Sequence, residues 1–209
     1  MRLAVDITKR LGSFCLRVAF ACEDGVLGIL GASGCGKSMT LKCIAGIERP
    51  DSGHIELDGV TLFDSEKRIN LPPQKRHVGY LFQNYALFPN MTVRQNILCG
   101  LRAEKRSRAQ SEQALHEVME LLGLTGLERR LPSQLSGGQQ QRTALARILI
   151  SQPKLLMLDE PFSALDTHLR EKLQIEMKHL LRSYQGATLM VTHSRDEAYR
   201  LCDRIALMK

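Results

Sequence analysis

Eight consecutive residues have the types and the spacing that bind a nucleotide phosphate. Gly31 to Ser38 read GASGCGKS and match the pattern G-x-x-x-x-G-K-[ST]. Glycines let the backbone turn tightly, so that its N–H groups point inward at an anion, and a following helix adds its positive end. Lys37 can reach the β- and γ-phosphates, and the Ser38 hydroxyl can bind Mg²⁺. The predicted nucleotide-binding residues are Gly31, Ala32, Ser33, Gly34, Cys35, Gly36, Lys37, Ser38 and Met39.

A second group consists of two carboxylates that follow an apolar run. Leu155 to Leu158 read LLML, and Asp159 and Glu160 come next. Ligands of an open parallel sheet bind beyond the carboxyl ends of its strands, so we expect Asp159 beside the phosphate loop, holding Mg²⁺ through its water shell. Strand alternation would direct Glu160 to the other side, where it could orient and deprotonate an attacking water. Without the phosphate loop, charges exposed at a strand end would be the simpler interpretation.

The third segment reads LSGGQQQR, from Leu135 to Arg142. Ser136 can cap a helix, and the two glycines after it expose the first helical N–H groups. This arrangement makes an anion site without a lysine. Taken alone, the segment would be interpreted as an ordinary capped helix.

These segments need a framework in which strands alternate with helices. The predicted strands around them are Val26–Leu30, Lys154–Leu158, Ala187–Val191 and Arg204–Met208. The predicted helices are Lys37–Ala45, Leu165–Ser183 and Arg195–Leu201. Such alternation indicates a mostly parallel sheet with helices on both faces.

Two other parts of the sequence have different patterns. Turn signals at 12–13 and 51–53 predict antiparallel hairpins, with strands within Val5–Phe20 and at Ile55–Leu57, and His77–Phe82 is a further strand candidate. From about residue 92 to 150 the apolar spacing is helical. The predicted fold class is therefore α/β, with a mostly parallel core sheet, a small antiparallel β subdomain and an inserted helical subdomain.

Composition limits the alternatives. The 209 residues are 44% apolar, which is enough for one sizeable core, and the formal net charge is +7. The six cysteines include no C-x-x-C pair, so we expect neither a zinc site nor a disulfide framework. Scattered cysteines of this kind fit a reducing compartment. The sequence has no signal-peptide pattern and no apolar run near the roughly 20 residues of a membrane helix.

Further motifs name a family. LSGGQ at Leu135–Gln139 resembles the signature of ATP-binding-cassette (ABC) transporter ATPases. Gln83 resembles the Q-loop glutamine of that family, Ser163 to Asp166 its D-loop, and His193 its switch histidine. With the phosphate loop and the acidic strand, six motifs occur in the family's order across essentially the whole chain. The chain therefore resembles an ABC nucleotide-binding subunit with a P-loop NTPase core.

The resemblance implies a mechanism that uses ATP and Mg²⁺. In the family, two subunits form a head-to-tail homodimer, and each ATP lies between the phosphate loop of one subunit and the signature of the other. The implied catalytic residues are Glu160, His193, Gln83 and Lys37, and the implied Mg²⁺ ligands are Ser38, Gln83 and, through water, Asp159. The residues implied to act on the other subunit's ATP are Ser136, Gly137, Gly138 and Gln139, with Asp166 in the D-loop.

The resemblance also implies how the chain is divided and with what it works. We expect one ABC ATPase domain over residues 1–209, with the core and β subdomain at 1–90 and 151–209 and the helical subdomain at 91–150. Residues 85–90 would help to line a groove for an integral-membrane permease, so the subunit would lie peripherally on the cytoplasmic face of the cell membrane. A C-terminal regulatory domain is expected to be absent from these residues.

Three stretches, at 48–53, 71–80 and 87–89, resemble bacterial importer ATPases. Leu62 to Ser65 and the compact N-terminus are most like the molybdate importer ATPase, whereas sulfate, iron, polyamine and sugar importers share much of the pattern. A substrate-binding protein would be an indirect partner, and no nucleic acid is expected. The adenine-stacking position is open, because Leu11 lies near the usual aromatic place and Phe14 is the nearest aromatic residue.

Two alternatives belong to other classes. ABC-type DNA-repair and chromosome ATPases also use the LSGGQ sandwich, and the positive charge favours them slightly, but they need coiled coils or mismatch-binding domains that do not fit in 209 residues. A P-loop small-molecule kinase would need neither the LSGGQ segment nor His193.

Overall fold

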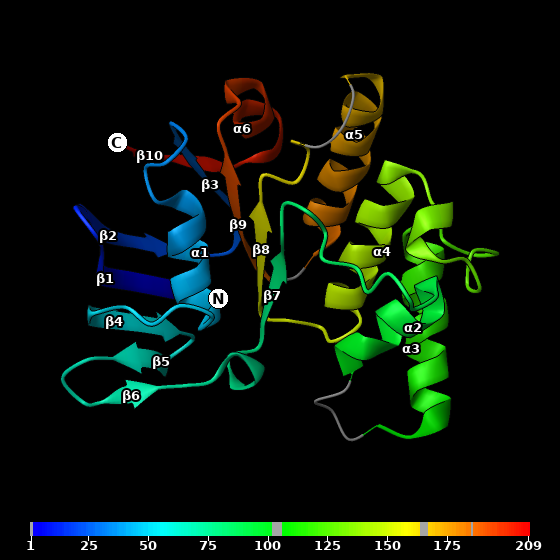
Figure 1. The fold of residues 1–209 in the computed structure, drawn as a ribbon, viewed down its shortest axis with the longest axis horizontal. Helices are drawn as coiled ribbons and strands as arrows, with labels where there is room; N and C mark the ends of the chain where they lie inside the picture. Colours follow the sequence, from blue (N-terminus) through cyan, green and yellow to red (C-terminus); the bar gives the residue numbers. More distant parts are fainter. Residues whose placement is uncertain (1, 102–105, 164–166, 185) are drawn as a thin grey trace. The chain divides into compact units, whose positions relative to one another are not determined.

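The structure is a computed structural model that describes residues 2–101, 106–163, 167–184 and 186–209 (Figure 1). Its contacts divide the chain into two compact units. The first comprises Met1–Tyr80, Lys154–Glu160 and Gln174–Lys209, and the second comprises Leu81–Pro153 and Pro161–Leu173. Each unit is described by itself. Among the described residues, no helix combines the length and the apolar character needed to cross a membrane.

The central sheet has the strand order β10-β3-β9-β8-β7 (Figure 1). Its strands are β3 (Gly25–Gly31), β7 (Val78–Leu81), β8 (Leu155–Asp159), β9 (Ala187–Thr192) and β10 (Arg204–Met208). Every residue of β8 and β9 is buried, which explains why both read as continuous apolar runs rather than as alternating patterns. The strands β10, β3, β9 and β8 are parallel to their neighbours.

The register of this sheet brings three chain segments to one edge, namely the edge at which the parallel strands have their carboxyl ends. Leu30 of β3 is paired with Thr192 of β9, and Asp159 of β8 is paired with Val191 of β9. The residues that follow these strands, namely the phosphate loop, Glu160 and His193, therefore leave the sheet at the same level. This register positions the first unit's candidate site.

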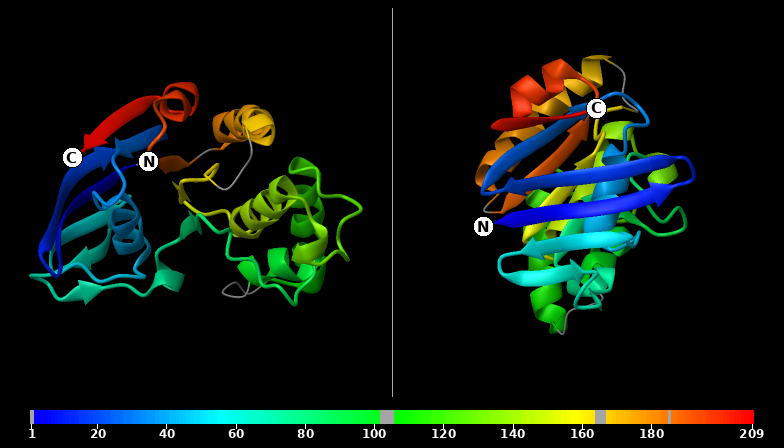
Figure 2. Two further views of the ribbon diagram at one scale, coloured as in Figure 1. Left: turned by 45° about the horizontal axis from the view of Figure 1, so that its top comes forward. Right: turned by 90° about the vertical axis from the view of Figure 1, so that its left-hand side faces the viewer.

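The second sheet is antiparallel and has the order β2-β1-β4-β5-β6. Its strands are β1 (Leu3–Leu11), β2 (Phe14–Cys22), β4 (Ser52–Leu57), β5 (Val60–Asp64) and β6 (Ile69–Asn70). The right-hand view of Figure 2 shows β2, β1 and β4 side by side. Leu3, Val5 and Ile7 alternate on the buried face of β1, as a half-buried strand requires.

The helix after the phosphate loop, α1 (Lys37–Ala45), is anchored at its end by a buried arginine. Arg76 is 1% exposed and donates to the carbonyls of Cys43 and Ile44, both at 2.9 Å. It also donates to Leu71 O and to Asn70 Oδ1, each at 2.8 Å. The last carbonyls of a helix lack the usual intrahelical partner. Cys43 O also accepts from Gly46 N–H, so Arg76 adds a second donor there and supplies a donor to Ile44 O. A 3-10 turn, η1 (Pro73–Lys75), leads directly to it.

The second unit is built from helices. They are α2 (Val93–Leu98), η2 (Cys99–Leu101), α3 (Arg108–Leu121), η3 (Pro132–Gln134) and α4 (Gly137–Leu149). Reciprocal capping boxes start α2, α3 and α4, each with a Ser or Thr cap and a Gln three residues later. Two further helices are α5 (Thr167–Ser183), which is divided between the units at Leu173 and Gln174, and α6 (Arg195–Leu201) of the first unit.

The α/β fold class predicted from the sequence is confirmed. α1 and β10 have the predicted bounds, whereas β1 and β2 are longer than predicted because they pair along their full length. The expected subdomain boundaries at residues 91 and 150 stay a prediction.

Candidate functional site

The phosphate loop connects β3 to α1 through left-handed backbone conformations. Gly34 has φ 85° and Gly36 has φ 101°, which residues other than glycine adopt only with strain. A side chain at Gly31 would also collide, because its Cβ would lie 2.4 Å from the carbonyl oxygen of Met208. The glycine positions of the motif are therefore required by the geometry of this loop.

Lys37 lies inside the loop rather than in solvent. Its side chain is 4% exposed, and Nζ donates to the carbonyls of Gly31 and Ala32 at 2.9 and 2.8 Å. These two hydrogen bonds compensate for taking the ammonium group out of water. The structure therefore places a positive charge at the centre of the predicted phosphate site.

Ser38 and Asp159 come together as the sequence predicted, although 121 residues separate them. Ser38 Oγ donates to Asp159 Oδ1 at 2.8 Å, and Asp159 is 5% exposed. Hydroxyl and carboxylate oxygens are the ligands that Mg²⁺ prefers, and Mg²⁺ is usually held by one or two protein groups together with waters and phosphate oxygens. This donor set fits Mg²⁺. The described residues hold no cluster of three or more His, Cys, Asp or Glu for a metal.

A third residue of this cluster was missed by the sequence analysis. Tyr80 of β7 donates its hydroxyl to Asp159 Oδ2 at 2.7 Å. Burial, assisted by the neighbouring carboxylate, raises the pKa of Tyr80 above its ordinary value. Its partner is 79 residues away in the sequence, so only the pairing of β7 with β8 could have identified it.

Glu160 corrects one expectation. Strand alternation does not direct its side chain, because β8 ends at Asp159 and Glu160 has a left-handed conformation with φ 45°. Its N–H remains bonded to Val191 O at 3.0 Å, so β9 still fixes the backbone here. A positive φ is uncommon for a residue other than glycine and is found at functional sites.

His193 reaches Glu160 across the edge of the sheet. Its Nδ1 lies 3.3 Å from Glu160 Oε2, and the two side chains are 56% and 17% exposed. The predicted base and the predicted switch histidine are thus in contact, with one side of the pair open to solvent.

The turn that carries His193 is stabilised by a buried carboxylate that the sequence analysis also missed. Thr192 Oγ1 donates to Glu197 Oε2 at 2.5 Å and accepts from the N–H of Ser194 at 3.0 Å. Ser194 caps α6 by accepting from the N–H of Glu197. The available signal was a serine followed three residues later by Glu.

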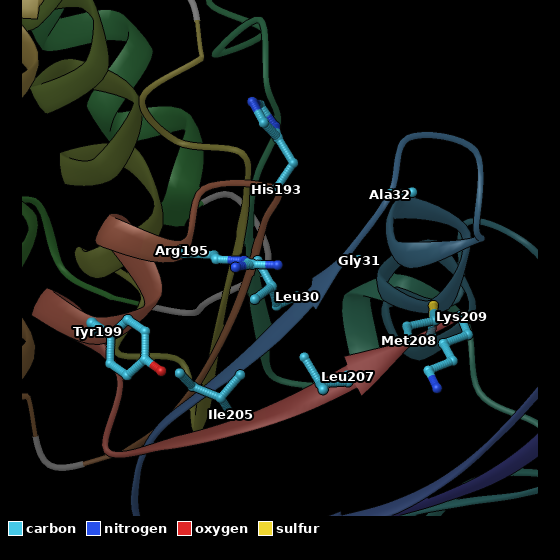
Figure 3. Close-up of a pocket in the computed structure, with 10 residues that line it drawn as sticks. All are labelled: Leu30, Gly31, Ala32, His193, Arg195, Tyr199, Ile205, Leu207, Met208 and Lys209. Atoms are coloured by element: carbon cyan, nitrogen blue, oxygen red, sulfur yellow. The ribbon is translucent and has the colours of Figure 1, made fainter.

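An open groove of about 630 Å³ lies beside this edge within the first unit (Figure 3). Gly31, Ala32 and His193 line one part of it, and Tyr199, Ile205 and Leu207 line another. The groove does not include Ser38 or Asp159, so the cluster of Ser38, Tyr80 and Asp159 is a separate feature of this unit. Phe14, which is 39% exposed, also lies near the phosphate loop, 3.5 Å from where a Cβ of Gly36 would be.

In the second unit, the signature segment forms the start of α4. Ser136 Oγ accepts from Gln139 N at 3.3 Å, and Gln139 Oε1 accepts from Ser136 N at 2.9 Å. Gly137 and Gly138 are the first two helical residues, whose N–H groups have no intrahelical acceptor. The predicted serine-capped helix start with two glycines is therefore present.

Gln83 also belongs to the second unit and is exposed. Its Nε2 donates to Ser163 Oγ at 3.1 Å, so the glutamine of one motif contacts the first residue of another. Asp166 lies outside the described residues.

The segment after Gln83 has an unusual shape. Tyr85 and Ala86 both have positive φ, at 59° and 44°. Arg147 of α4 donates to both of their carbonyls at 2.9 and 2.7 Å, and its guanidinium lies 5.5 Å from the ring centre of the half-exposed Phe88. The side chain of buried Asn96 accepts a hydrogen bond from the Phe88 N–H and donates one to the Phe88 carbonyl. The sequence analysis missed Arg147 and Asn96.

The comparisons with known proteins agree with this geometry. The family model described as "ABC transporter" matches residues 17–163. The Fe(3+) ions import ATP-binding protein FbpC of Haemophilus influenzae is 45% identical over 193 residues, 92% of this chain and 54% of that protein. A spermidine/putrescine import ATP-binding protein PotA of Methylococcus capsulatus is 45% identical over 206 residues, 97% of this chain and 52% of that protein.

A third relative is the molybdenum import ATP-binding protein ModC of Paramagnetospirillum magneticum. It is 41% identical over 206 residues, 99% of this chain and 56% of that protein. The chain thus spans about half the length of the curated relatives it matches. Among solved structures, a dimeric ATP-binding cassette in a post-hydrolysis state, bound to ADP and Pi, matches with a TM-score of 0.77 at 27% identity, covering 100% of this chain and 94% of that one.

Proposed function

This chain belongs to the ABC transporter family, and we propose that it is the ATP-hydrolysing subunit of a bacterial importer. The match to the family model covers residues 17–163, and the proposal extends the ABC ATPase domain over all 209 residues, with ATP as the nucleotide and Mg²⁺ as the metal. The observation that carries the proposal is that β3, β8 and β9 of the first unit's sheet end at the same level. This register brings the Lys37 ammonium, the Ser38–Asp159 pair and the Glu160–His193 pair to the ends of neighbouring strands.

Each group at this edge has a chemical role in the proposal. The loop N–H groups and Lys37 bind the phosphates, and Ser38 and Asp159 hold Mg²⁺, Asp159 through water. Mg²⁺ supplies charge neutralisation on the β- and γ-phosphate oxygens when it is bound. Glu160 orients the attacking water and accepts its proton. His193, which is in contact with Glu160, is proposed to bind the γ-phosphate.

The second half of the site is proposed to come from another copy of the chain. The start of α4 offers N–H groups without a cationic side chain, which suits a phosphate that another subunit already binds. The solved relative is a dimer, as expected of such a shared site. In this proposal ATP binding closes the homodimer, and loss of the γ-phosphate weakens it.

The membrane partner is proposed to dock on residues 85–90. Arg147 and Asn96 hold this segment in a fixed shape, and Phe88 stays 45% exposed on it. The segment follows Gln83 directly, so a change around that glutamine can reach the partner. The subunit would then lie at the cytoplasmic face of the membrane beside its permease, with a substrate-binding protein as an indirect partner.

The proposed substrate class is an oxyanion such as molybdate. The support is the resemblance of Leu62–Ser65 and the N-terminal strands to molybdate importers, together with the molybdenum-import relative. Iron, polyamine and sulfate importers are the alternatives, and their ATPases have 42–46% identity to this chain.

Transport measured on a reconstituted complex tests this proposal. The ATPase is purified with its permease, placed in vesicles and supplied with molybdate, tungstate or sulfate and the matching binding protein. Oxyanion uptake that needs ATP supports both the importer and the oxyanion substrate class. Uptake of iron or polyamine instead would discard the oxyanion class, and a chain that associates with no integral-membrane permease would discard the importer.

A further inference from the structure

We propose that Tyr80 is a positioning residue of the ATPase site: its hydroxyl holds the Asp159 carboxylate so that the other oxygen faces Ser38. The inference rests on ATP hydrolysis with Mg²⁺ and does not depend on what the importer carries. It adds a residue that none of the six sequence motifs contains.

The geometry gives each oxygen of Asp159 its own donor. Tyr80 OH donates to Oδ2 at 2.7 Å, and Ser38 Oγ donates to Oδ1 at 2.8 Å. Tyr80 is 8% exposed and Asp159 is 5% exposed, so water does not easily replace either contact. Both distances are at the centre of the range of well-formed O–H···O hydrogen bonds.

The effect of the Tyr80 contact follows from the torsion that it restrains. The terminal torsion of an aspartate is broad and has no sharply preferred staggered wells. With Ser38 alone, the plane of the carboxylate could still rotate about this torsion, because one donor restrains only one oxygen. A second donor on the opposite oxygen removes this freedom, so Asp159 is already oriented before the metal arrives.

The element that carries Tyr80 is suited to this task. β7 is the neighbour of β8 in the sheet, so both side chains project from adjacent strands rather than from loops. Side chains on strands are held more precisely than side chains on loops. The contact therefore makes β7 part of the metal site, although the sequence places it far from both the phosphate loop and the acidic strand.

Tyr80→Phe is the direct test, because it removes one oxygen and keeps the buried ring. Mn²⁺ serves as the spectroscopic probe and is titrated into the whole chain with bound ATP, with the free ion measured by its electron paramagnetic resonance signal. We expect the Mn²⁺ affinity to fall about tenfold, which is the lower end of what loss of an outer hydrogen bond costs a metal site. ATP binding in EDTA should remain as in the original chain, because the contact acts only on the metal ligand.

The steady-state kinetics should separate positioning from general damage. For Tyr80→Phe we expect a large fold-increase in the Mg²⁺ concentration that gives the half-maximal ATPase rate. The fold-decrease in the rate at saturating Mg²⁺ should be smaller. Tyr184→Phe is the matched control. It also alters a tyrosine whose pKa burial raises, to about 12, but Tyr184 precedes the opposite, amino-terminal end of β9. The control should change neither quantity.

Two results would overturn the proposal. One is an unchanged Mn²⁺ affinity in Tyr80→Phe. The other is an equal loss of ATP binding in EDTA and with Mn²⁺, since this would mean that the tyrosine supports the whole fold rather than the metal ligand.

Discussion

Glu160 takes its direction from its own backbone rather than from the strand before it. Its φ of 45° turns the side chain out of the β8 pattern, while its N–H stays bonded to Val191. The result is a carboxylate in contact with His193, next to a neighbour, Asp159, that contacts Ser38. Two adjacent carboxylates can therefore have separate tasks because one residue leaves the strand conformation.

This separation predicts the behaviour of Glu160→Gln. The amide keeps the shape and can still contact His193, but it cannot accept the proton of the attacking water. ATP hydrolysis by the purified chain should fall at least about a hundredfold, as expected for loss of a general base. ATP binding, measured by equilibrium titration, should be retained. The exposed Glu23 provides a control, since Glu23→Gln should alter neither quantity. Near-normal turnover in Glu160→Gln would contradict the base assignment.

Phe14 is the residue that we expect to contact adenine. It lies against Gly36 of the phosphate loop and is 39% exposed, so its ring is open to a ligand. Phe14→Ala should lower ATP affinity by about fivefold, corresponding to about 1 kcal/mol of stacking. Triphosphate alone, used as a competitor, should bind both variants equally. Equal weakening of ATP and triphosphate would assign Phe14 to the shape of the loop instead.

At the scale of elements, α1 is held at both ends. Its start is the left-handed Gly36, and its end is the cluster of carbonyls that Arg76 binds. Since α1 presents Ser38 to Asp159, the anchoring of this helix supports the metal ligands as well as the core.

Arg76→Met should therefore destabilise the protein. The methionine fills much of the same volume but removes the Arg76 donors from the carbonyls of Ile44 and Leu71 and one of the two donors of Cys43 O, which should cost about 3 kcal/mol in the free energy of unfolding. Chemical denaturation measures the difference. Lys75→Met is the matched control, because Lys75 is the exposed neighbour and its loss should change stability little. Equal effects of both substitutions would show that the carbonyl contacts are unimportant.

Much of the element pattern could be predicted from the sequence, and the reasons are local. The bounds of α1 follow from the glycines before it and Gly46 after it, and β8 and β9 follow from unbroken apolar runs. Tyr80, Arg76 and Arg147 could not be predicted, because their partners are set by strand order and helix packing rather than by neighbouring residues. Strand alternation was the wrong reason for the direction of Glu160, since alternation applies only while the strand continues and β8 ends at Asp159.

At the scale of the whole molecule, one chain carries both of the proposed half-sites. The first unit contains the phosphate loop and the Glu160–His193 pair, and the second unit contains the capped start of α4. The proposed sandwich of two copies gives both half-sites a use, because each ATP would meet the first kind from one chain and the second kind from its partner. A monomer should then bind ATP but hydrolyse it poorly.

The most direct test is the mass of Glu160→Gln in solution, by light scattering, with and without Mg²⁺-ATP. The account predicts a monomer without nucleotide and twice that mass with ATP, since binding proceeds and hydrolysis does not release the partner. Adding Ser136→Arg should keep the chain monomeric, because the arginine obstructs the proposed partner site at the start of α4, while ATP binding to the monomer stays unchanged. A monomer in ATP for Glu160→Gln, or a dimer that persists with Ser136→Arg, would contradict the shared site.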